Sequence, residues 1–461
     1  MPKDRQAIFN RGTDVGILAQ QIFPGGFDVS PSSIKKYGES VEKTKELIDK
    51  GAEVIYEAAF IFNEVLAALD ILVKRDGKWY AYEVKSSLKI TPAYVMDASL
   101  QYYVIKNCLP DLEDFFLVTI NNDYELSDKL DVQQLFKPTS LKRDVVANLP
   151  FIESKIAQAK KIIADGDMPS VPIGEHCFKP YKCDYFGTCW KSVPEKNVFQ
   201  LSALGLPQQV EWYKKGIKTI AAIEDTSELS SNVQIQIESV KQGKEYFEKE
   251  KVKDFFSKLH YPIGFFDIEL FAPAVPVFKG TKAYQQIPFL FSLHILSEKQ
   301  ELSETHFYAD PGEDPREQFV LACIEKLKDM GSILVFDSNL EHGVLNSLVK
   351  KFPQHNEAIQ NIKKRIVDLS LPFANYWYFH PATLGSASLK NLYRKLLKDD
   401  SFEKMHVNSG TMATYSYNAL FEETDLFKIE ETKQQLIEYC KMDTLATAKL
   451  FLYLREKCNE I

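Results

Sequence analysis

Two groups of charged residues, far apart in the chain, have the side chains needed to bind a divalent cation. They are Asp70 with Glu83 and Lys85, and Asp267 with Glu269, Tyr439 and Asp443. Carboxylate oxygens are the preferred ligands of hard cations such as Mg²⁺ and Mn²⁺. A cation held in this way can activate water and stabilise the charge that develops on a phosphate under attack. The residue types therefore predict two metal-dependent sites for phosphodiester hydrolysis.

A β-hairpin would assemble the first group. Asp76-Gly77 separates two β-prone runs, and Asp-Gly in this setting is a strong signal for a two-residue turn. With these residues in the turn, Arg75 pairs with Lys78. Side chains alternate along each strand, so this pair fixes the face on which every other residue of the hairpin lies.

Counting from that pair places Asp70 opposite Glu83, with Cβ atoms about 4.5–5.5 Å apart. Lys85 shares the face of Glu83, because it lies two residues further along the strand. Two carboxylates so close repel each other unless a proton or a cation lies between them. The alternative is an exposed polar face on which Lys85 neutralises Glu83.

Flanking residues favour the metal site. Glu57 precedes the hairpin, and Asp97 and Gln101 share one face of a predicted helix that follows it. With Gln101-Tyr102, the pattern resembles the PD-(D/E)xK nuclease core of the RecB type, which CRISPR-associated exonucleases share. The resemblance implies metal ligands Asp70 and Glu83, a catalytic lysine Lys85, a further acid Glu57 and a positioning residue Gln101.

The second group also falls on regular structure. Ile263–Leu270 is a predicted buried strand, which places Asp267 and Glu269 on one face. Glu430–Leu454 has a helical pattern, in which Tyr439 and Asp443 project together at positions i and i+4. Acids that converge on one sheet edge suit two-metal phosphoryl transfer.

Two further apolar runs, 333–336 and 365–368, are predicted strands that end near acidic residues. Asp337 and Glu341 are the acidic residues that follow the first run. Asp368 ends the second run, where it is expected to terminate the strand or cap a turn rather than bind metal.

These motifs, in this order, resemble the DEDDy branch of the RNase H-like 3′–5′ exonucleases, which have a DnaQ-type fold. The resemblance implies that Tyr439 orients the attacking water. It also implies that four carboxylates bind the metal ions: Asp267, Glu269, Glu341 and Asp443. Asp337 is the alternative to Glu341 as the ligand from the second motif.

A third group contains three equally spaced thiols, Cys177, Cys183 and Cys189, in an aromatic setting with His176 beside the first. Clustered thiols suggest metal ligation. RecB-type nucleases often close an iron–sulfur cluster with such a trio and a fourth, upstream cysteine, but this chain has no cysteine before Cys108. A Zn²⁺ site that includes His176, an incomplete iron–sulfur cluster, and reduced thiols packed among aromatic rings all stay open.

The composition agrees with a multidomain α/β enzyme. The 461 residues include seven cysteines and carry a net charge of −8. An odd number of cysteines without a paired framework favours a reducing cytoplasm, and no apolar run approaches the roughly 18 residues of a membrane span. The negative charge argues against a large nonspecific nucleic-acid footprint, but an exonuclease that holds few nucleotides needs few phosphate contacts.

Three parts are predicted: residues 1–195, a PD-(D/E)xK restriction-endonuclease-like module with the cysteine region; 196–257, a helical connector; and 258–461, the RNase H-like module. Within them, 241–258 is expected to form one charged, exposed helix. The whole arrangement resembles a bacterial family that fuses a RecB-like nuclease to an RNase H-like exonuclease. The matching residues include Arg11-Gly12, Gly25-Gly26, Ser86-Ser87, Tyr181 and Thr444.

These observations predict a Mg²⁺- or Mn²⁺-dependent nuclease that acts on DNA, as single strands or 3′ ends, in repair, recombination or defence against foreign DNA. One alternative keeps a single active site, with RNA as the substrate. Another is a catalytically inert scaffold that binds nucleic acid. No membrane partner is expected, and the sequence leaves any protein partner unknown.

Overall fold

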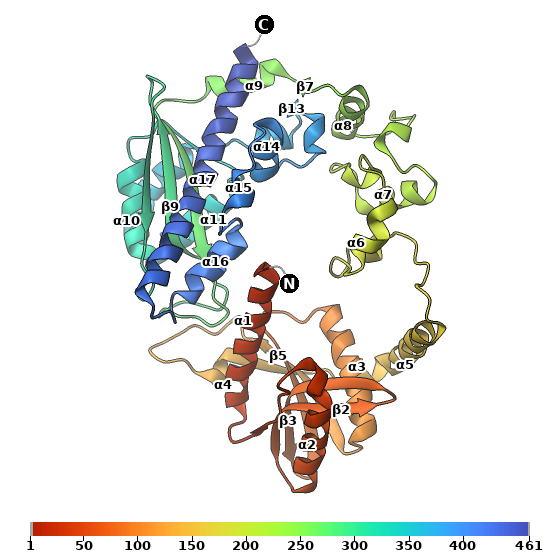
Figure 1. The fold of residues 1–461 in the computed structure, drawn as a ribbon. Helices are drawn as coiled ribbons and strands as arrows, with labels where there is room; N and C mark the ends of the chain where they lie inside the picture. Colours follow the sequence, from red (N-terminus) through yellow and green to blue (C-terminus); the bar gives the residue numbers. More distant parts are fainter. Residues whose placement is uncertain (1–2, 460–461) are drawn as a thin grey trace. The chain divides into compact units, whose positions relative to one another are not determined.

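The computed structural model describes residues 3–459, with side chains from residue 11 onward. Its contacts divide the chain into two compact units. The first unit is Met1–Val171 with Ala272–Gln285, and the second is Pro172–Phe271 with Gln286–Ile461. The chain is therefore a multidomain α/β protein in which one segment of the predicted C-terminal module belongs to the N-terminal unit (Figure 1).

The first unit contains a six-stranded mixed sheet in the order β1-β2-β3-β4-β5-β6. The strands are β1 (Phe27–Asp28), β2 (Val54–Phe62), β3 (Val65–Arg75), β4 (Lys78–Lys85), β5 (Leu112–Ile120) and β6 (Phe136–Ser140). The helices are α1 (Lys3–Ala19), α2 (Tyr37–Asp49), α3 (Pro92–Cys108), α4 (Val132–Leu135) and α5 (Lys142–Asp165). Strands β4 and β5 are parallel, so the chain needs a crossover between them, and α3 supplies it.

The predicted hairpin is confirmed. Arg75 pairs with Lys78, and Ile71 pairs with Tyr82, in an antiparallel ladder. Asp76 and Gly77 form the turn with φ of 51° and 75°, the left-handed values that a type I′ hairpin turn requires at both positions. Alternation then separates the side chains of β4. Tyr82 packs in the cluster on the α1 side of the sheet, whereas Glu83 lies on the opposite, α3 side.

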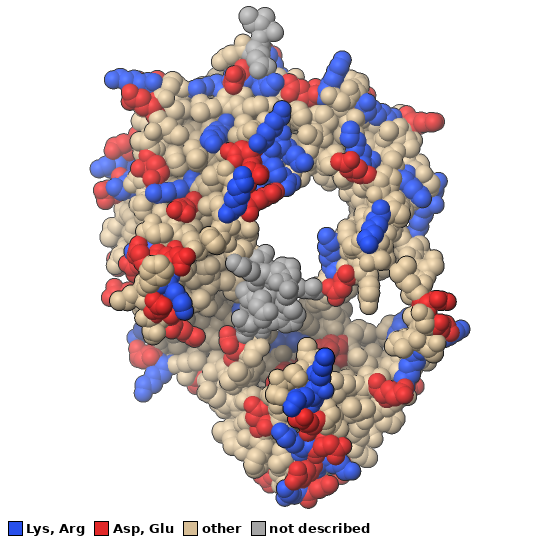
Figure 2. All heavy atoms as spheres, viewed as in Figure 1, with Lys and Arg blue, Asp and Glu red and all other residues tan. Residues whose placement is uncertain are grey.

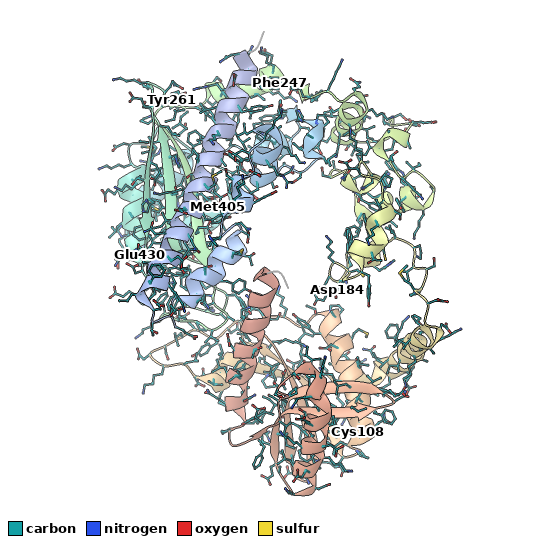
Figure 3. The ribbon with its side chains drawn as sticks, in the orientation of Figure 1. Cys108, Asp184, Phe247, Tyr261, Met405 and Glu430 are labelled. Atoms are coloured by element: carbon teal, nitrogen blue, oxygen red, sulfur yellow. The ribbon has the colours of Figure 1, made fainter. Side chains whose placement is uncertain are left out.

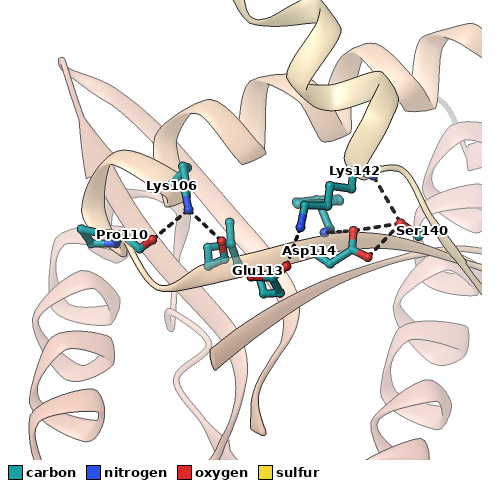
Figure 4. Close-up of polar contacts among 8 residues, drawn as sticks. Lys106, Pro110, Glu113, Asp114, Ser140 and Lys142 are labelled. Atoms are coloured by element: carbon teal, nitrogen blue, oxygen red, sulfur yellow. Dashed lines mark hydrogen bonds and ion pairs between the residues drawn. The ribbon is translucent and has the colours of Figure 1, made fainter. Parts of the chain in front are cut away.

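Polar contacts fasten the beginning of β5, the neighbour of β4 (Figure 4). Lys106, in the last turn of α3, donates to the carbonyl oxygens of residues 110 and 112, each at 2.8 Å. At the end of β6, Ser140 Oγ donates to the Asp114 carboxylate at 2.8 Å, and Lys142 at the start of α5 pairs with Glu113. These contacts hold α3 and α5 against the sheet and thus support the strand that carries Glu83.

The segment Ala272–Gln285 completes the core of the first unit. Ala274 and Ala283 are buried in the cluster that contains Tyr82. Backbone hydrogen bonds join the segment to Leu126, whose N–H donates to the carbonyl of residue 281 at 2.9 Å. Tyr284 Oη donates to the Ser86 carbonyl at 2.5 Å. This loop follows β8 in sequence, but it forms part of the core of the first unit.

The second unit contains a five-stranded sheet in the order β10-β9-β8-β11-β12 and a two-stranded sheet of β13 and β7. The strands are β7 (Tyr246–Phe247), β8 (Ile263–Phe271), β9 (Ile287–Leu296), β10 (Leu302–Tyr308), β11 (Ser332–Val335), β12 (Ile366–Asp368) and β13 (Tyr378–Phe379). Strand β8 runs antiparallel to β9 and parallel to β11.

Helices surround this sheet and form the region that precedes it. They are α6 (Phe186–Cys189), α7 (Leu206–Lys214), α8 (Ser231–Gln242), α9 (Lys249–Ser257), α10 (Arg316–Leu327), α11 (Asn339–Lys351), α12 (Asn356–Lys364), α13 (Leu371–Ala374), α14 (Leu389–Leu396), α15 (Ser401–Lys404), α16 (Gly410–Ala419) and α17 (Leu426–Asn459). Within residues 3–459, none of the helices combines the length and apolarity that crossing a membrane requires.

Alternation along β8 separates its core residues from its acids. Phe266 and Ile268 pack with the buried residues of α10, α11 and α12 on one face. Phe265 packs against Phe451 of α17, with ring centroids 5.5 Å apart, on the other face. Asp267 has the same parity as Phe265, so it faces α17, which runs across β8 and β9 (Figure 1).

The cysteine region packs with the second unit and not with the first. Trp190 lies 5.2 Å from Phe178 and 4.7 Å from Phe199, and Phe199 lies 5.1 Å from Tyr213, measured between ring centroids. This continuous aromatic cluster joins the cysteine region to the predicted connector. By their contacts, the compact units divide after Val171, and the module boundary near residue 195 stays a prediction.

The single charged helix predicted over residues 241–258 is wrong. Helix α8 ends at Gln242, because Gly243 adopts a left-handed φ of 67° that stops the helix. The chain then forms β7, where Phe247 pairs with Tyr378. Helix α9 starts only at Lys249. Charge content predicted exposure here but not the break, which depends on one glycine and on pairing with a distant strand.

Charged side chains of both signs are intermixed on the face shown in Figure 2, without a single large basic area. This distribution agrees with the net charge of −8 and with a footprint of few phosphate contacts.

Ala283→Asp should destabilise the first unit, although the residue lies within the predicted C-terminal module. The substitution buries an unpaired carboxylate in an apolar cluster, at a cost of about 3 kcal/mol or more. Hydrogen exchange should show faster exchange in β4 and β5 than in the wild type, with β8 and β9 little changed. Lys282→Asp, at the exposed neighbouring position, is the control. Equal protection in both variants would contradict a structural role for this segment.

Candidate active sites

The carboxyl end of β4 carries the first candidate site. Lys85 Nζ donates to Glu83 Oε1 at 2.8 Å and to Asp97 Oδ2 of α3 at 2.7 Å. Glu83 is buried, and Lys85 is half-buried. The lysine is thus held between a carboxylate on its own strand and one on the crossover helix, which fixes its ammonium group at the mouth of the site.

Asp70 is held differently from the expectation. The β3–β4 ladder ends at the Ile71–Tyr82 pair, one step before the predicted pairing of Asp70 with Glu83. Instead, Asp70 Oδ2 accepts a hydrogen bond from the Val84 N–H at 2.5 Å. The side chain therefore replaces a ladder contact, and the strands separate where the acids meet.

Glu57, on β2, interrupts the pairing between β2 and β3. The β2–β3 ladder pairs Tyr56 with Ile71 and Ala58 with Leu69 but omits Glu57. Glu57 has a φ of 57°, which is a left-handed conformation that costs energy for any residue except glycine. Such strain is typical of functional sites, where a side chain must be directed away from the regular sheet.

Burial and crowding govern the acid–base properties of this site. Burial, with the adjacent Asp70 carboxylate, raises the pKa of Glu83 to about 8. Burial is also the main cause that raises the pKa of Asp70 to about 6. The pKa of Glu57 rises to about 7 through burial and through the carboxylates of Asp28 and Glu83. Burial opposes the Lys85 ammonium, but Glu83 and Asp97 outweigh it and raise the lysine pKa.

Two buried oxygen atoms in the first unit, Glu83 Oε2 and Gln101 Oε1, have no hydrogen-bond partner among the described residues. Buried polar atoms normally have a partner, since desolvation without one costs free energy. A cation bound by Glu83 would satisfy its unpaired oxygen and offset the repulsion from Asp70. The residues therefore fit a divalent metal ion.

The second candidate site lies where β8 meets α17. Ligand atoms of Asp267, Glu269 and Cys440 lie within 4.8 Å of one another, and this is the only such group of three in the described part of the chain. Cys440 Sγ is 3.7 Å from Asp267 Oδ2. Asp443 follows one turn along α17 and is also buried. The strand and the helix thus bring together acids that are far apart in sequence.

Tyr439 belongs to the same group. Its hydroxyl is hydrogen-bonded to the Asp443 carboxylate and accepts a hydrogen bond from Lys390 Nζ at 2.8 Å. Burial, with the carboxylates of Asp443 and Glu269, raises the pKa of Tyr439 far above its ordinary value. The hydroxyl therefore keeps its proton and can orient a neighbouring group but cannot act as a base.

Glu341, rather than Asp337, faces the acidic group. Glu341 is only 1% exposed, and its charge contributes to the raised pKa of Asp267. Asp337 is exposed, and its Oδ1 accepts a hydrogen bond from the Asn339 side chain at 2.7 Å. Glu341 Oε2 has no partner among the described residues, so it is free to bind a cation.

Asp368 ends β12, as the sequence predicts. Its carboxylate accepts hydrogen bonds from the N–H groups of Asp337, Ser338 and Ser370, at 2.8 to 3.1 Å. Despite burial, these bonds hold the pKa of Asp368 below its ordinary value. The residue fixes the turn that carries Asp337 and precedes Glu341.

Burial raises the pKa of all four acids at the second site. Burial is the largest cause for Asp267 and Glu269, whose pKa values rise well above the ordinary range, and Asp443 adds to both. Burial raises the pKa of Asp443 to about 6, although Lys390 opposes the shift. Burial likewise raises the pKa of Glu341 to about 8. A bound cation would reverse these shifts, because it favours the charged form of each ligand.

The structure does not gather the three thiols of the cysteine region. Cys177 is buried with its Sγ 3.7 Å from His176 Nε2, whereas Cys183 is half-buried and Cys189 is exposed. They form no close group of metal ligands among the described residues. Asp184 marks this region in Figure 3. The rings of Phe186 and Trp190 stack here, with centroids 4.2 Å apart. The geometry shows aromatic packing and leaves the identity of any bound metal a prediction.

Three residues near the two sites were given no role from the sequence. Asp97, which binds Lys85, carried a signal, since it shares a helix face with Gln101. Cys440 is part of the Tyr439 motif, but its distance from Asp267 depends on how α17 packs. Lys390 carried no local signal, because it reaches Tyr439 from a separate helix.

Comparison with known proteins gives one partial match. A family model described as a domain of unknown function, DUF2779, matches residues 264–388. The matched region contains Asp267, Glu269 and Glu341 but neither Tyr439 nor Asp443, and it includes none of the first candidate site. No curated protein and no solved structure matches the chain.

Glu341→Gln should make the metal-free protein more stable than the wild type at pH 8 but not at pH 4. The pKa of Glu341 is about 8 in the folded protein against 4.5 for an ordinary glutamate, so stability present below pH 4.5 is lost as pH rises through 8. Glutamine has no such loss, and the gain at pH 8 should be on the order of 1 kcal/mol or more. Urea unfolding in a chelator would measure it.

The control for that measurement is Glu456→Gln, which neutralises an exposed glutamate on α17. It should show no comparable dependence on pH. Equal pH profiles for Glu341→Gln and the wild type would show that Glu341 is not held in a costly environment.

Manganese should raise the melting temperature, and Asp70→Asn and Asp267→Asn should each remove part of the gain. Binding to the folded state alone stabilises by about 2.7 kcal/mol at a 100-fold excess over Kd. Asp329→Asn, at an exposed position, should keep the full shift. A shift that both site variants retain in full would contradict both metal sites.

Proposed function

We propose that this chain is a metal-dependent nuclease that hydrolyses phosphodiester bonds of DNA, with one exonuclease site and one RecB-like site. The observation that carries the proposal is the group formed by half-buried Asp267 with buried Glu269 and Asp443, in which the Tyr439 hydroxyl is bonded to Asp443. Buried acids with strongly shifted pKa values cluster at catalytic sites. At other positions such acids lower the stability of the protein and serve no catalytic purpose.

The second unit would remove nucleotides from 3′ ends. Asp267, Glu269, Glu341 and Asp443 would hold Mg²⁺ or Mn²⁺, which supplies charge neutralisation at the phosphate and lowers the pKa of water. Tyr439 keeps its proton and would orient the attacking water. Attack on phosphorus breaks the bond to the 3′ oxygen, which leaves with a proton. The sheet with α17 across β8 and β9 supports the RNase H-like fold.

The first unit would carry the RecB-like, PD-(D/E)xK activity. Asp70 and Glu83 would hold a metal ion of the same kind, and the Lys85 ammonium would stabilise charge on the attacked phosphate. Glu57, with a pKa of about 7, can take up or release a proton near neutral pH. Gln101 is buried on α3 and would position the substrate or water.

Two other functions remain as alternatives. In one, a single site is active and the RNase H-like half cleaves RNA. In the other, the chain is an inert scaffold that binds nucleic acid. The unpartnered oxygens of Glu83 and Glu341 favour an enzyme over the scaffold, because a scaffold has no need for buried carboxylates that lack partners.

Wild-type protein with Mn²⁺ should convert 5′-labelled single-stranded DNA into a ladder of stepwise shorter products. Asp267→Asn should slow the ladder by at least about 100-fold, the scale on which a group stabilising the transition state acts. Lys85→Ala should leave the ladder intact. A second outcome is cleavage that persists in Asp267→Asn and disappears in the double variant Asp267→Asn/Lys85→Ala. That result would assign the remaining cleavage to the first site.

Asp329→Asn is the matched control and should cleave like the wild type. Matched RNA tests the alternative substrate. Absence of cleavage of both DNA and RNA by the wild type would refute the enzyme and leave the scaffold.

A further inference from the structure

Lys390, on α14, makes unusually specific contacts with the tyrosine of the second site. Its Nζ donates to Tyr439 Oη at 2.8 Å and to the Asn408 carbonyl at 2.6 Å. The same ammonium lies 4.5 Å from the ring centroid of Tyr439 and 5.2 Å from that of Phe402. Two directed hydrogen bonds and two aromatic faces hold the lysine in one place.

The hydrogen bonds of Tyr439 define what its hydroxyl can still do. A tyrosine hydroxyl has one proton to donate and can accept hydrogen bonds. It donates a hydrogen bond to the Asp443 carboxylate, and it accepts one from Lys390. Its remaining capacity is to accept a hydrogen from one further donor. A water molecule that donates a hydrogen bond to Tyr439 can direct its own lone pairs toward an electrophile.

We propose that Lys390 is a positioning residue of the exonuclease reaction, which fixes the Tyr439 hydroxyl so that it accepts a hydrogen bond from the attacking water. The inference rests on the proposed function of the second site. Lys390 acts through Tyr439, so its loss should lower the rate of the bound complex more than the affinity for DNA.

A cavity offers the competing role for this lysine. Lys390 lines a cavity of about 330 Å³ together with Asn391, Arg394 and Asn408. In that position its ammonium could contact a substrate phosphate directly. The cavity also contains three acidic residues, among them Glu403, which pairs with Arg394. This acidic lining is unfavourable for phosphate, so the contact with Tyr439 is the role the geometry favours.

The test compares Lys390→Met, Tyr439→Phe and the double variant on 5′-labelled single-stranded DNA with Mn²⁺. Lys390→Met should lower kcat about 10-fold or more, the scale of a lost charge-assisted hydrogen bond, with KM changed less than about 2-fold. In the Tyr439→Phe background, the same change should have little further effect, because residues that act as a unit are not additive. Lys395→Met, an exposed lysine on the same helix, should match the wild type.

Melting temperatures of the variants would reveal a simple folding defect. Lys390→Arg keeps a hydrogen-bond donor and should retain more activity than Lys390→Met. Three outcomes would overturn the inference. They are a wild-type kcat in Lys390→Met, a change confined to KM, and losses of activity that multiply fully when Lys390→Met is combined with Tyr439→Phe. These outcomes are distinct from failure of the proposed function, which would show as a wild-type protein without a ladder or as a ladder that survives Asp267→Asn. In that case the inference falls with it.

Discussion

The rest of the structure depends on holding several carboxylates close together where little of their surface meets solvent. In the second unit, Asp267 comes from β8, Glu341 from α11 and Asp443 from α17. Their repulsion is strong in a low-dielectric interior and is not relieved by any residue within the acidic group. Apolar packing that has no part in the chemistry keeps these elements in place, above all the contact of Phe265 with Phe451. Free energy from core burial therefore offsets the electrostatic cost of the site.

The two sites compensate their negative charge in different ways. In the first, Lys85 lies on the same strand as Glu83 and bridges to Asp97, so a counter-charge is built into the hairpin and its crossover helix. In the second, the counter-charge comes from Lys390 on the separate helix α14, which donates to Tyr439 and acts electrostatically on Glu269 and Asp443. The first site is thus partly organised by its own ion pairs. The second has less internal compensation, so its acids have more to gain from a bound cation.

The segment Ala272–Gln285 ties the two halves of the sequence together. It begins directly after β8, the strand of Asp267 and Glu269, and it ends in the first unit with Tyr284 bonded to the carbonyl of Ser86, next to Lys85. Its alanines are small enough to enter the core beside Tyr82. The sequence modules are therefore not independent folding units, because each half of the chain supplies part of the first unit.

Local patterns alone determined much of this protein. Asp76-Gly77 set the hairpin register, alternation put Asp267 and Glu269 on one face of β8, and helical spacing put Tyr439 beside Asp443. These features follow from interactions within a few residues, where backbone geometry leaves few choices. Tertiary structure alone decided the strand separation at Asp70, the spread of the thiols and the reach of Lys390 to Tyr439. Each depends on packing between elements distant in sequence, for which no local periodicity exists.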